Sequence, residues 1–253
     1  MRNIKLTIEY DGKDFNGWQK QPNKLNIQGS IEQAISQITG EEIDLQASGR
    51  TDAGVHALGQ VANFKTNSQI PIEKFAIAIN SRLKKSIIIK KAEEVPDRFH
   101  SRYNCKQKTY RYVINNSETG SAIYRNLEYN IKMPLDVKKM QEAANYFVGE
   151  HDFTGFKASG TSSKSSVRTI YSAKVIKDNE RIAIELTGNG FLYNMVRIIA
   201  GTLVEVGLGK IKPEEITGII ESKDRQKAGK TLPPYGLYLS LIHISEPTRQ
   251  AEI

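Results

Sequence analysis

The residues at positions 49–56 are the first in the chain whose types and spacing could do chemistry. They run Gly-Arg-Thr-Asp-Ala-Gly-Val-His, with Arg50 and Asp52 two positions apart between two glycines. On an extended backbone, side chains two positions apart project to the same side, so a guanidinium and a carboxylate would form an ion pair or share a ligand. The alternative is a tight turn in which Asp52 caps the next segment and Arg50 points to solvent, and residue types alone favour this turn.

A second candidate is the run Tyr110, Arg111 and Tyr112, which places a cation between two aromatic rings on a predicted strand. Aromatic rings on a strand can stack on unpaired bases, at roughly 1–3 kcal/mol per base, while cations bind the phosphates. Tyrosines two positions apart on a strand more often pack into the core with their hydroxyls at its edge. The sequence therefore predicts either a base-stacking surface or a buried aromatic pair.

Arg197 is a third candidate because it lies within the apolar segment 191–199. Burying an uncompensated guanidinium is costly, so this side chain needs either an acidic partner or a path to the helix surface. The residue types alone do not decide between the two.

Two glycine motifs that resemble nucleotide-binding loops are excluded. Gly188-Asn189-Gly190 does not continue as a dinucleotide-binding fingerprint. Gly229-Lys230-Thr231 imitates the end of a phosphate-binding loop, but Asp224 stands where that loop needs its first glycine. Nucleoside triphosphate binding is not expected.

Periodicity predicts the elements that must position these residues. Alternating patterns predict strands at residues 4–10, 60–65, 87–95, 108–114 and 181–187. A helix is expected after Asn26, its N-cap, and Gly40 ends it; further helical patterns cover residues 71–83, 137–147 and 191–206 and a segment after Pro213.

Because strands and helices are interspersed in both halves, the chain is expected to be α/β or α+β, with two similar-sized lobes divided near residue 105. We expect an N-terminal lobe at 1–104 that carries the Asp52 loop and a C-terminal lobe at 105–239. The hydroxyl-rich stretch 159–166 is the best candidate for a linker or lid.

Composition limits the class of partner and the kind of site. Lys and Arg total 36 against 28 for Asp and Glu, a net charge of +8, which favours a polyanionic partner. The one cysteine and four widely separated histidines predict no disulfide framework and no metal site, and they favour a reducing compartment. The chain has neither the long apolar run of a signal peptide nor that of a membrane span.

Several short segments, taken together and in order, resemble the tRNA pseudouridine synthase A family. They span about residues 2–239 and comprise Ile8-Glu9-Tyr10-Asp11-Gly12, Trp18-Gln19, residues 49–56, Phe99-His100-Ser101-Arg102-Tyr103, Lys108-Thr109-Tyr110-Arg111-Tyr112, Val167-Arg168-Thr169-Ile170, residues 191–198 and residues 232–239. Each segment is weak alone, but the ordered set is specific.

The resemblance implies an α+β pseudouridine synthase fold, a mixed, mostly antiparallel sheet shared by two similar lobes and flanked by helices. It also implies an isomerase that converts uridine to pseudouridine at positions 38 to 40 of the transfer RNA anticodon arm. The family is homodimeric and uses neither metal nor organic cofactor, and a cytoplasmic enzyme is expected. The alternative is a catalytically inactive RNA-binding or RNA-folding protein on the same scaffold.

The resemblance also implies roles for single residues. Asp52 corresponds to the essential aspartate, Tyr110 to the tyrosine that stacks on the target base, and Arg197 to an arginine paired with the aspartate. Arg50 is expected to bind phosphate or to hold the flipped nucleotide, and Lys106, Lys108, Lys164 and Arg168 are further candidate phosphate ligands.

The last residues depart from the family. After Leu239 the family continues as a closing apolar strand, whereas residues 240–253 form an atypical tail, and we hypothesise that this tail is not native. We therefore place the last strand in doubt and give His243 no functional role.

Overall fold

The structure is a computed structural model that describes residues 1–160 and 165–244. The chain divides into two compact units, Met1–Lys106 with Leu239–Ile253, and Gln107–Tyr238. The last strand thus belongs with the first unit. Residues 161–164 of the expected lid, including Lys164, and residues 245–253 of the atypical tail lie outside the described residues.

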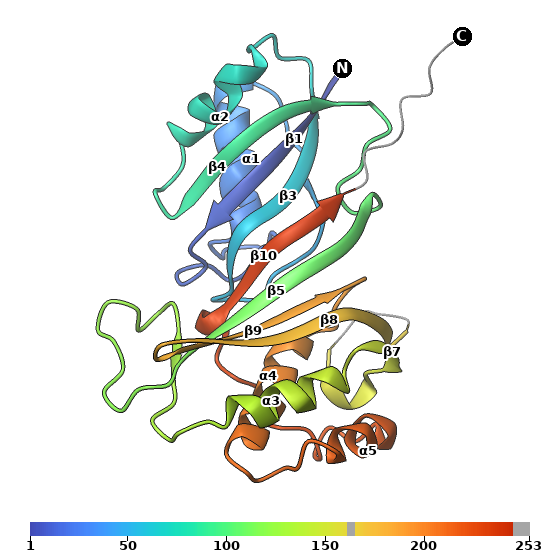
Figure 1. The fold of residues 1–253 in the computed structure, drawn as a ribbon. Coiled ribbons are helices and arrows are strands. Elements are labelled where there is room, and N and C mark those ends of the chain that lie inside the picture. Colours follow the sequence, from blue (N-terminus) through green and yellow to red (C-terminus); the bar gives the residue numbers. More distant parts are fainter. Residues whose placement is uncertain (161–164, 245–253) are drawn as a thin grey trace. The chain divides into compact units, whose positions relative to one another are not determined.

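In the first unit, β1 lies between β4 and β3 and pairs with both in antiparallel fashion (Figure 1). The strand order of this unit is β4-β1-β3-β10, with the short β2 beside β3, and the bounds are β1 Arg2–Tyr10, β2 Gln46–Ala47, β3 His56–Thr66, β4 Ile87–Val95 and β10 Leu237–Ile244. Ile4, Leu6 and Ile8 of β1 are fully buried, because alternate side chains of a strand share one face.

Two helices, α1 (Ile27–Thr39) and α2 (Ile72–Asn80), pack on the sheet of the first unit. The rings of Phe64 on β3 and Phe75 on α2 meet edge-on, with centroids 6.1 Å apart. The expected cap of α1 is confirmed, since the Asn26 side chain accepts from the Gly29 N–H at 2.8 Å. Gly40 ends the helix in the left-handed conformation, at φ 74°.

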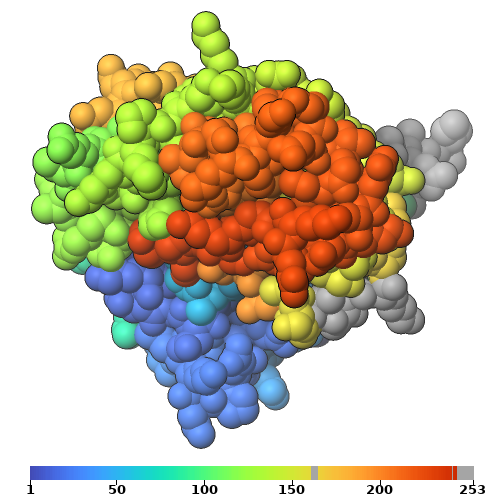
Figure 2. All heavy atoms as spheres, turned by 90° about the horizontal axis from the view of Figure 1, so that it is seen from below, coloured from blue at the N-terminus to red at the C-terminus, as the bar shows by residue number. Residues whose placement is uncertain are grey.

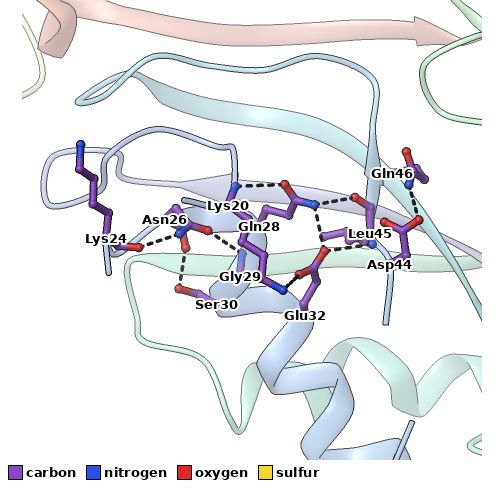
Figure 3. Close-up of polar contacts among 10 residues, drawn as sticks. All are labelled: Lys20, Lys24, Asn26, Gln28, Gly29, Ser30, Glu32, Asp44, Leu45 and Gln46. Atoms are coloured by element: carbon purple, nitrogen blue, oxygen red, sulfur yellow. Dashed lines mark hydrogen bonds and ion pairs between the residues drawn. The ribbon is translucent and has the colours of Figure 1, made fainter. Parts of the chain in front are cut away.

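A buried carboxylate ties α1 to the loop before it (Figure 3). Glu32 is 6% exposed, and its oxygens accept from Lys20 Nζ at 3.2 Å, Gln28 Nε2 at 2.9 Å and the Leu45 N–H at 3.2 Å. Since the charge is fully hydrogen-bonded, its burial is tolerated. The loop that carries Trp18 is therefore held against the helix.

The strands of the second unit follow one another in the order β5-β9-β8-β7, and β6 pairs with β5 in parallel while the other printed pairings of β5, β7, β8 and β9 are antiparallel. The strands are β5 Cys105–Asn115, β6 Tyr129–Asn130, β7 Gly149–Asp152, β8 Val167–Asp178 and β9 Arg181–Gly188. Its helices are α3 Val137–Asn145, α4 Met195–Gly207 and α5 Glu215–Ser222, with short 3-10 turns at Thr154–Phe156 and Pro234–Gly236. The orange and red atoms of α5 and the segment after it form a continuous part of this unit's surface (Figure 2).

The α+β class is confirmed, and every predicted strand and helix forms near its expected place. The predicted helix at 191–206 begins only at Met195, because Asn194 adopts a left-handed backbone with φ 60°. The helix expected at 71–83 ends at Asn80. The doubt about the last strand is not supported, since β10 continues to Ile244 and Ile242 is 9% exposed. In the described parts of the chain, no helix is long and apolar enough to cross a membrane.

Candidate active site

The loop that carries Asp52 joins β2 to β3 and lies against the loop that follows β1. The Trp18 N–H donates to the Thr51 carbonyl at 3.0 Å, and the Gly54 N–H donates to the Phe15 carbonyl at 3.3 Å. A Cβ added to Gly17, whose φ is 84°, would lie 2.6 Å from the Thr51 oxygen. The close approach of the two loops therefore requires glycine at position 17.

Buried side chains hold the same loop from the sheet side. The Tyr10 hydroxyl hydrogen-bonds the Thr51 hydroxyl at 2.8 Å. Gln60 Nε2 donates to the Gly49 carbonyl at 2.8 Å, and the Ser48 hydroxyl donates to Gln60 Oε1 at 2.7 Å. Because these hydrogen bonds hold Gly49 and Thr51, the chain is fixed on both sides of Arg50.

His56 closes the loop at the start of β3. It is 2% exposed, and its Nδ1 accepts from the Gly12 N–H at 3.1 Å and lies 3.1 Å from Asp11 Oδ1. A Cβ on Gly12 would meet the Val55 oxygen at 1.9 Å, so only glycine fits there.

The loop backbone turns at Asp52, as one of the two sequence interpretations expected. The Val55 N–H donates to the Asp52 carbonyl at 3.2 Å. Burial alternates along the segment: Arg50 is exposed, Thr51 is buried and Asp52 is half-buried. Thr51 is thus the most deeply buried of these three residues.

Tyr110 lies on β5 in the second unit, opposite Leu186 of β9. It is 8% exposed, and its ring meets Phe191 edge-on, with centroids 5.2 Å apart at 81°. Tyr112 fits the core interpretation more fully, since it is wholly buried and its hydroxyl donates to the Pro233 carbonyl at 2.8 Å. Burial raises the pKa of Tyr112 above its ordinary value, so its hydroxyl stays protonated.

Arg197 extends from the first turn of α4 in the second unit. Its Nε donates to the Leu232 carbonyl at 2.7 Å, and its Nη1 donates to Asn194 Oδ1 at 2.6 Å. A Cβ on Gly201, one turn later, would lie 1.8 Å from the Lys230 oxygen, so the segment before Leu232 packs directly on the helix. The guanidinium is therefore oriented by backbone that is itself tightly packed.

Arg168 is the second residue of β8 and is one of the candidate phosphate ligands. Its Nη1 donates to the Val167 carbonyl at 2.6 Å and to the Ser165 carbonyl at 3.1 Å. Burial lowers the pKa of Arg168 below its usual value, because desolvation disfavours the charged form. Lys106 is exposed and Lys108 is half-buried.

The predicted residues thus fall into two groups. Arg50 and Asp52 share one loop of the first unit, whereas Tyr110 and Arg197 belong to β5 and α4 of the second. Sequence reasoning missed the residues that hold these groups in place, which are Tyr10, Trp18, Gln60, Phe191 and Asn194. The signals in the sequence were the glycines at positions 12 and 17, in the loop that contacts the Asp52 segment, and the family-like segments that contain Tyr10, Trp18 and Phe191.

Comparison with known proteins agrees with this arrangement. A family model described as tRNA pseudouridine synthase matches residues 6–104 and 143–243. Three relatives cover 94% of this chain each. A tRNA pseudouridine synthase A of Caldicellulosiruptor bescii is 58% identical over 239 residues, 98% of its own length. One of Acetivibrio thermocellus is 54% identical over 239 residues, also 98% of its length. A tRNA pseudouridine synthase A 2 of Clostridium tetani is 53% identical over 240 residues, 97% of its length.

Both lobes of the chain are matched by the family model, and the identity to the relatives extends over almost the whole of each. The chain belongs to the tRNA pseudouridine synthase family, a family of isomerases, and its α+β structure is a pseudouridine synthase fold.

Proposed function

We propose that this chain converts uridine to pseudouridine at positions 38 to 40 in the anticodon arm of transfer RNA, with Asp52 as the essential carboxylate. The observation that carries the proposal is the family match, which includes Arg50, Asp52 and Arg197. Tyr110 lies between the two matched stretches, and its assignment is supported by the ordered motifs around it.

The chemistry of the first step requires a carboxylate. Breaking the bond from uracil N1 to ribose C1′ leaves positive charge on the sugar and negative charge on the base, as in glycoside cleavage. A carboxylate below the sugar stabilises that positive charge, and we assign this role to Asp52. The carboxylate then either forms an ester at C1′ or removes the C2′ proton to give a glycal, and both routes use the same oxygen atoms.

The second step requires that the detached uracil rotate and rejoin through C5 without escaping. A flat aromatic wall restricts that motion to the plane of the base, and we assign this wall to Tyr110. The C5 proton is then removed either by the Tyr110 hydroxyl or by a relay linked to Asp52.

The arginines act on charge and position. We assign Arg197 to keeping Asp52 ionised and oriented, and Arg50 to a phosphate or to the flipped nucleotide. Taking a uridine out of its stack costs a few kcal/mol, which stacking and phosphate contacts offset. The net charge of +8 supports such contacts, because it concentrates phosphate-bearing ligands near the surface.

We further propose a homodimer that works in the cytoplasm without metal or organic cofactor. The single cysteine and the four dispersed histidines support the metal-free part of this proposal, because a thiolate or imidazole metal site needs clustered ligands. The chemistry outlined above also balances without any added group, since uridine and pseudouridine are isomers.

Mapping pseudouridine in unmodified transfer RNA transcripts tests the proposal. After incubation with the protein, we expect pseudouridine at uridines 38 to 40 and unmodified uridine elsewhere in the anticodon arm. Binding that weakens steeply with salt is expected both for the enzyme and for an inactive RNA-binding protein, so binding alone does not separate them. Tight binding with no pseudouridine at any position would contradict the proposal and favour the inactive binder.

A further inference from the structure

A buried hydroxyl pair lies directly behind the Asp52 loop. Tyr10 is 3% exposed and Thr51 is 6% exposed, and their hydroxyl oxygens are 2.8 Å apart. Thr51 is the residue immediately before Asp52 in the chain, whereas Tyr10 is the last residue of β1. The contact therefore joins the sheet of the first unit to the residue next to the essential carboxylate.

The pair belongs to a wider buried network. Gln60 is fully buried, and its Nε2 donates to the Gly49 carbonyl while its Oε1 accepts from the Ser48 hydroxyl, on the residues just before Thr51. The ring of Trp18 lies 6.0 Å from the ring of Tyr10, and the Trp18 N–H donates to the Thr51 carbonyl. Both the side chain and the backbone of Thr51 are thus held, from two different segments.

The Thr51 side chain is placed differently from those of its neighbours. Burial runs from exposed Arg50 through buried Thr51 to half-buried Asp52, so the Thr51 side chain lies deeper in the unit than the side chains of its two neighbours. Without its hydroxyl partner, the Thr51 side chain would lose the interaction that fixes this placement. Small changes in the placement of a reacting group cost large factors in rate.

We propose that the Tyr10 and Thr51 hydroxyls form a positioning pair that holds the Asp52 carboxylate in its reactive direction. This role rests on the proposed function of Asp52. Neither hydroxyl touches the substrate in this account. The pair acts on the rate of the chemical step and leaves the binding of transfer RNA to other residues.

The test replaces each hydroxyl without removing the bulk of its side chain. For Thr51→Val and Tyr10→Phe, we expect kcat to fall about tenfold to a hundredfold, while KM for transfer RNA changes less than about threefold. Thr51→Ser keeps the hydroxyl and is expected to retain kcat within about threefold of the original chain. If Thr51 contributed to stability alone, the folded molecules of Thr51→Ser and Thr51→Val would have the same kcat.

Thr66→Val is the matched control. Thr66 is the last residue of β3 in the same unit and is 1% exposed. Its hydroxyl donates to Glu41 and accepts from the Ser68 N–H at 3.0 Å. We expect Thr66→Val to lower the thermal unfolding midpoint and to leave kcat per folded molecule unchanged. If Thr51→Val is unfolded at the assay temperature, Tyr10→Phe and Thr51→Ser decide the question.

Three results would overturn the inference. The first is an unchanged kcat in Tyr10→Phe or in folded Thr51→Val, and the second is a change confined to KM. The third is a Thr51→Ser variant as slow as Thr51→Val. If Asp52→Asn is inactive while Thr51→Val turns over normally, only the positioning role is lost. Full activity of Asp52→Asn would overturn the proposed function and this inference together.

Discussion

Replacing Asp52 with Asn is expected to lower pseudouridine formation by about a thousandfold or more. The amide keeps the size of the side chain, but it carries no negative charge to stabilise the sugar and no nucleophilic or basic oxygen. The loop should remain folded, because backbone hydrogen bonds and the side chains of Ser48, Thr51, Gln60 and His56 hold it in place. The measurement is single-turnover conversion of an anticodon-arm transcript, with its affinity measured separately.

Asp44→Asn provides the control for this substitution. Asp44 is an exposed aspartate of the same unit that accepts from Gln46 Nε2 at 2.6 Å. Both variants raise the net charge by one, so both should bind transfer RNA to the same extent. Turnover is expected to stay normal in Asp44→Asn. Product formation by Asp52→Asn at the rate of this control would show that Asp52 is not the essential carboxylate.

Replacing Tyr110 with Leu is expected to lower turnover about tenfold to a hundredfold, since stacking on a base contributes about 1–3 kcal/mol. Leucine keeps an apolar side chain against Phe191 but has no flat face to confine the detached uracil. Tyr110→Phe keeps the ring, so it separates the ring from the hydroxyl. Slow turnover in Tyr110→Phe with normal binding would show that the Tyr110 hydroxyl removes the C5 proton. Normal turnover would restrict the role of Tyr110 to stacking.

Tyr171→Leu is the corresponding control for Tyr110. Tyr171 lies on β8 of the same sheet and is 49% exposed. Its replacement should change neither turnover nor affinity by more than about threefold. A Tyr110→Leu variant that behaves like Tyr171→Leu would contradict the assignment of Tyr110.

Periodicity was sufficient to predict the elements whose one face is apolar. The strand predicted at residues 87–95 has those bounds in the structure, and Asn26 caps α1 as expected. The strand β8 was missed, because its exposed face carries tyrosine and isoleucine, at positions 171 and 176, beside lysines and blurs the alternation. The start of α4 was placed too early, because an apolar run does not reveal that Asn194 has a positive φ.

The candidate site shows a similar division. Asp52 and Arg197 could be singled out because a carboxylate between glycines and a cation in an apolar segment are unusual. The residues that hold them could not, because Tyr10 and Gln60 are distant from position 52 in sequence and look like ordinary strand residues. Their role depends on the pairing of β1 with β3, which brings Ile8 opposite Gln60 and Tyr10 opposite Ala57. Such long-range register is a property of the fold and not of any local pattern.

The most direct test of the central claim uses transfer RNA transcripts that carry tritium at C5 of uridine. Isomerisation replaces the C5–H bond with a bond to C1′, so each conversion must release one C5 hydrogen to water and no free base. We predict that released tritium equals the pseudouridine formed at positions 38 to 40, and that Asp52→Asn releases neither tritium nor uracil. Free uracil, or pseudouridine formed at the full rate by Asp52→Asn, would contradict the account.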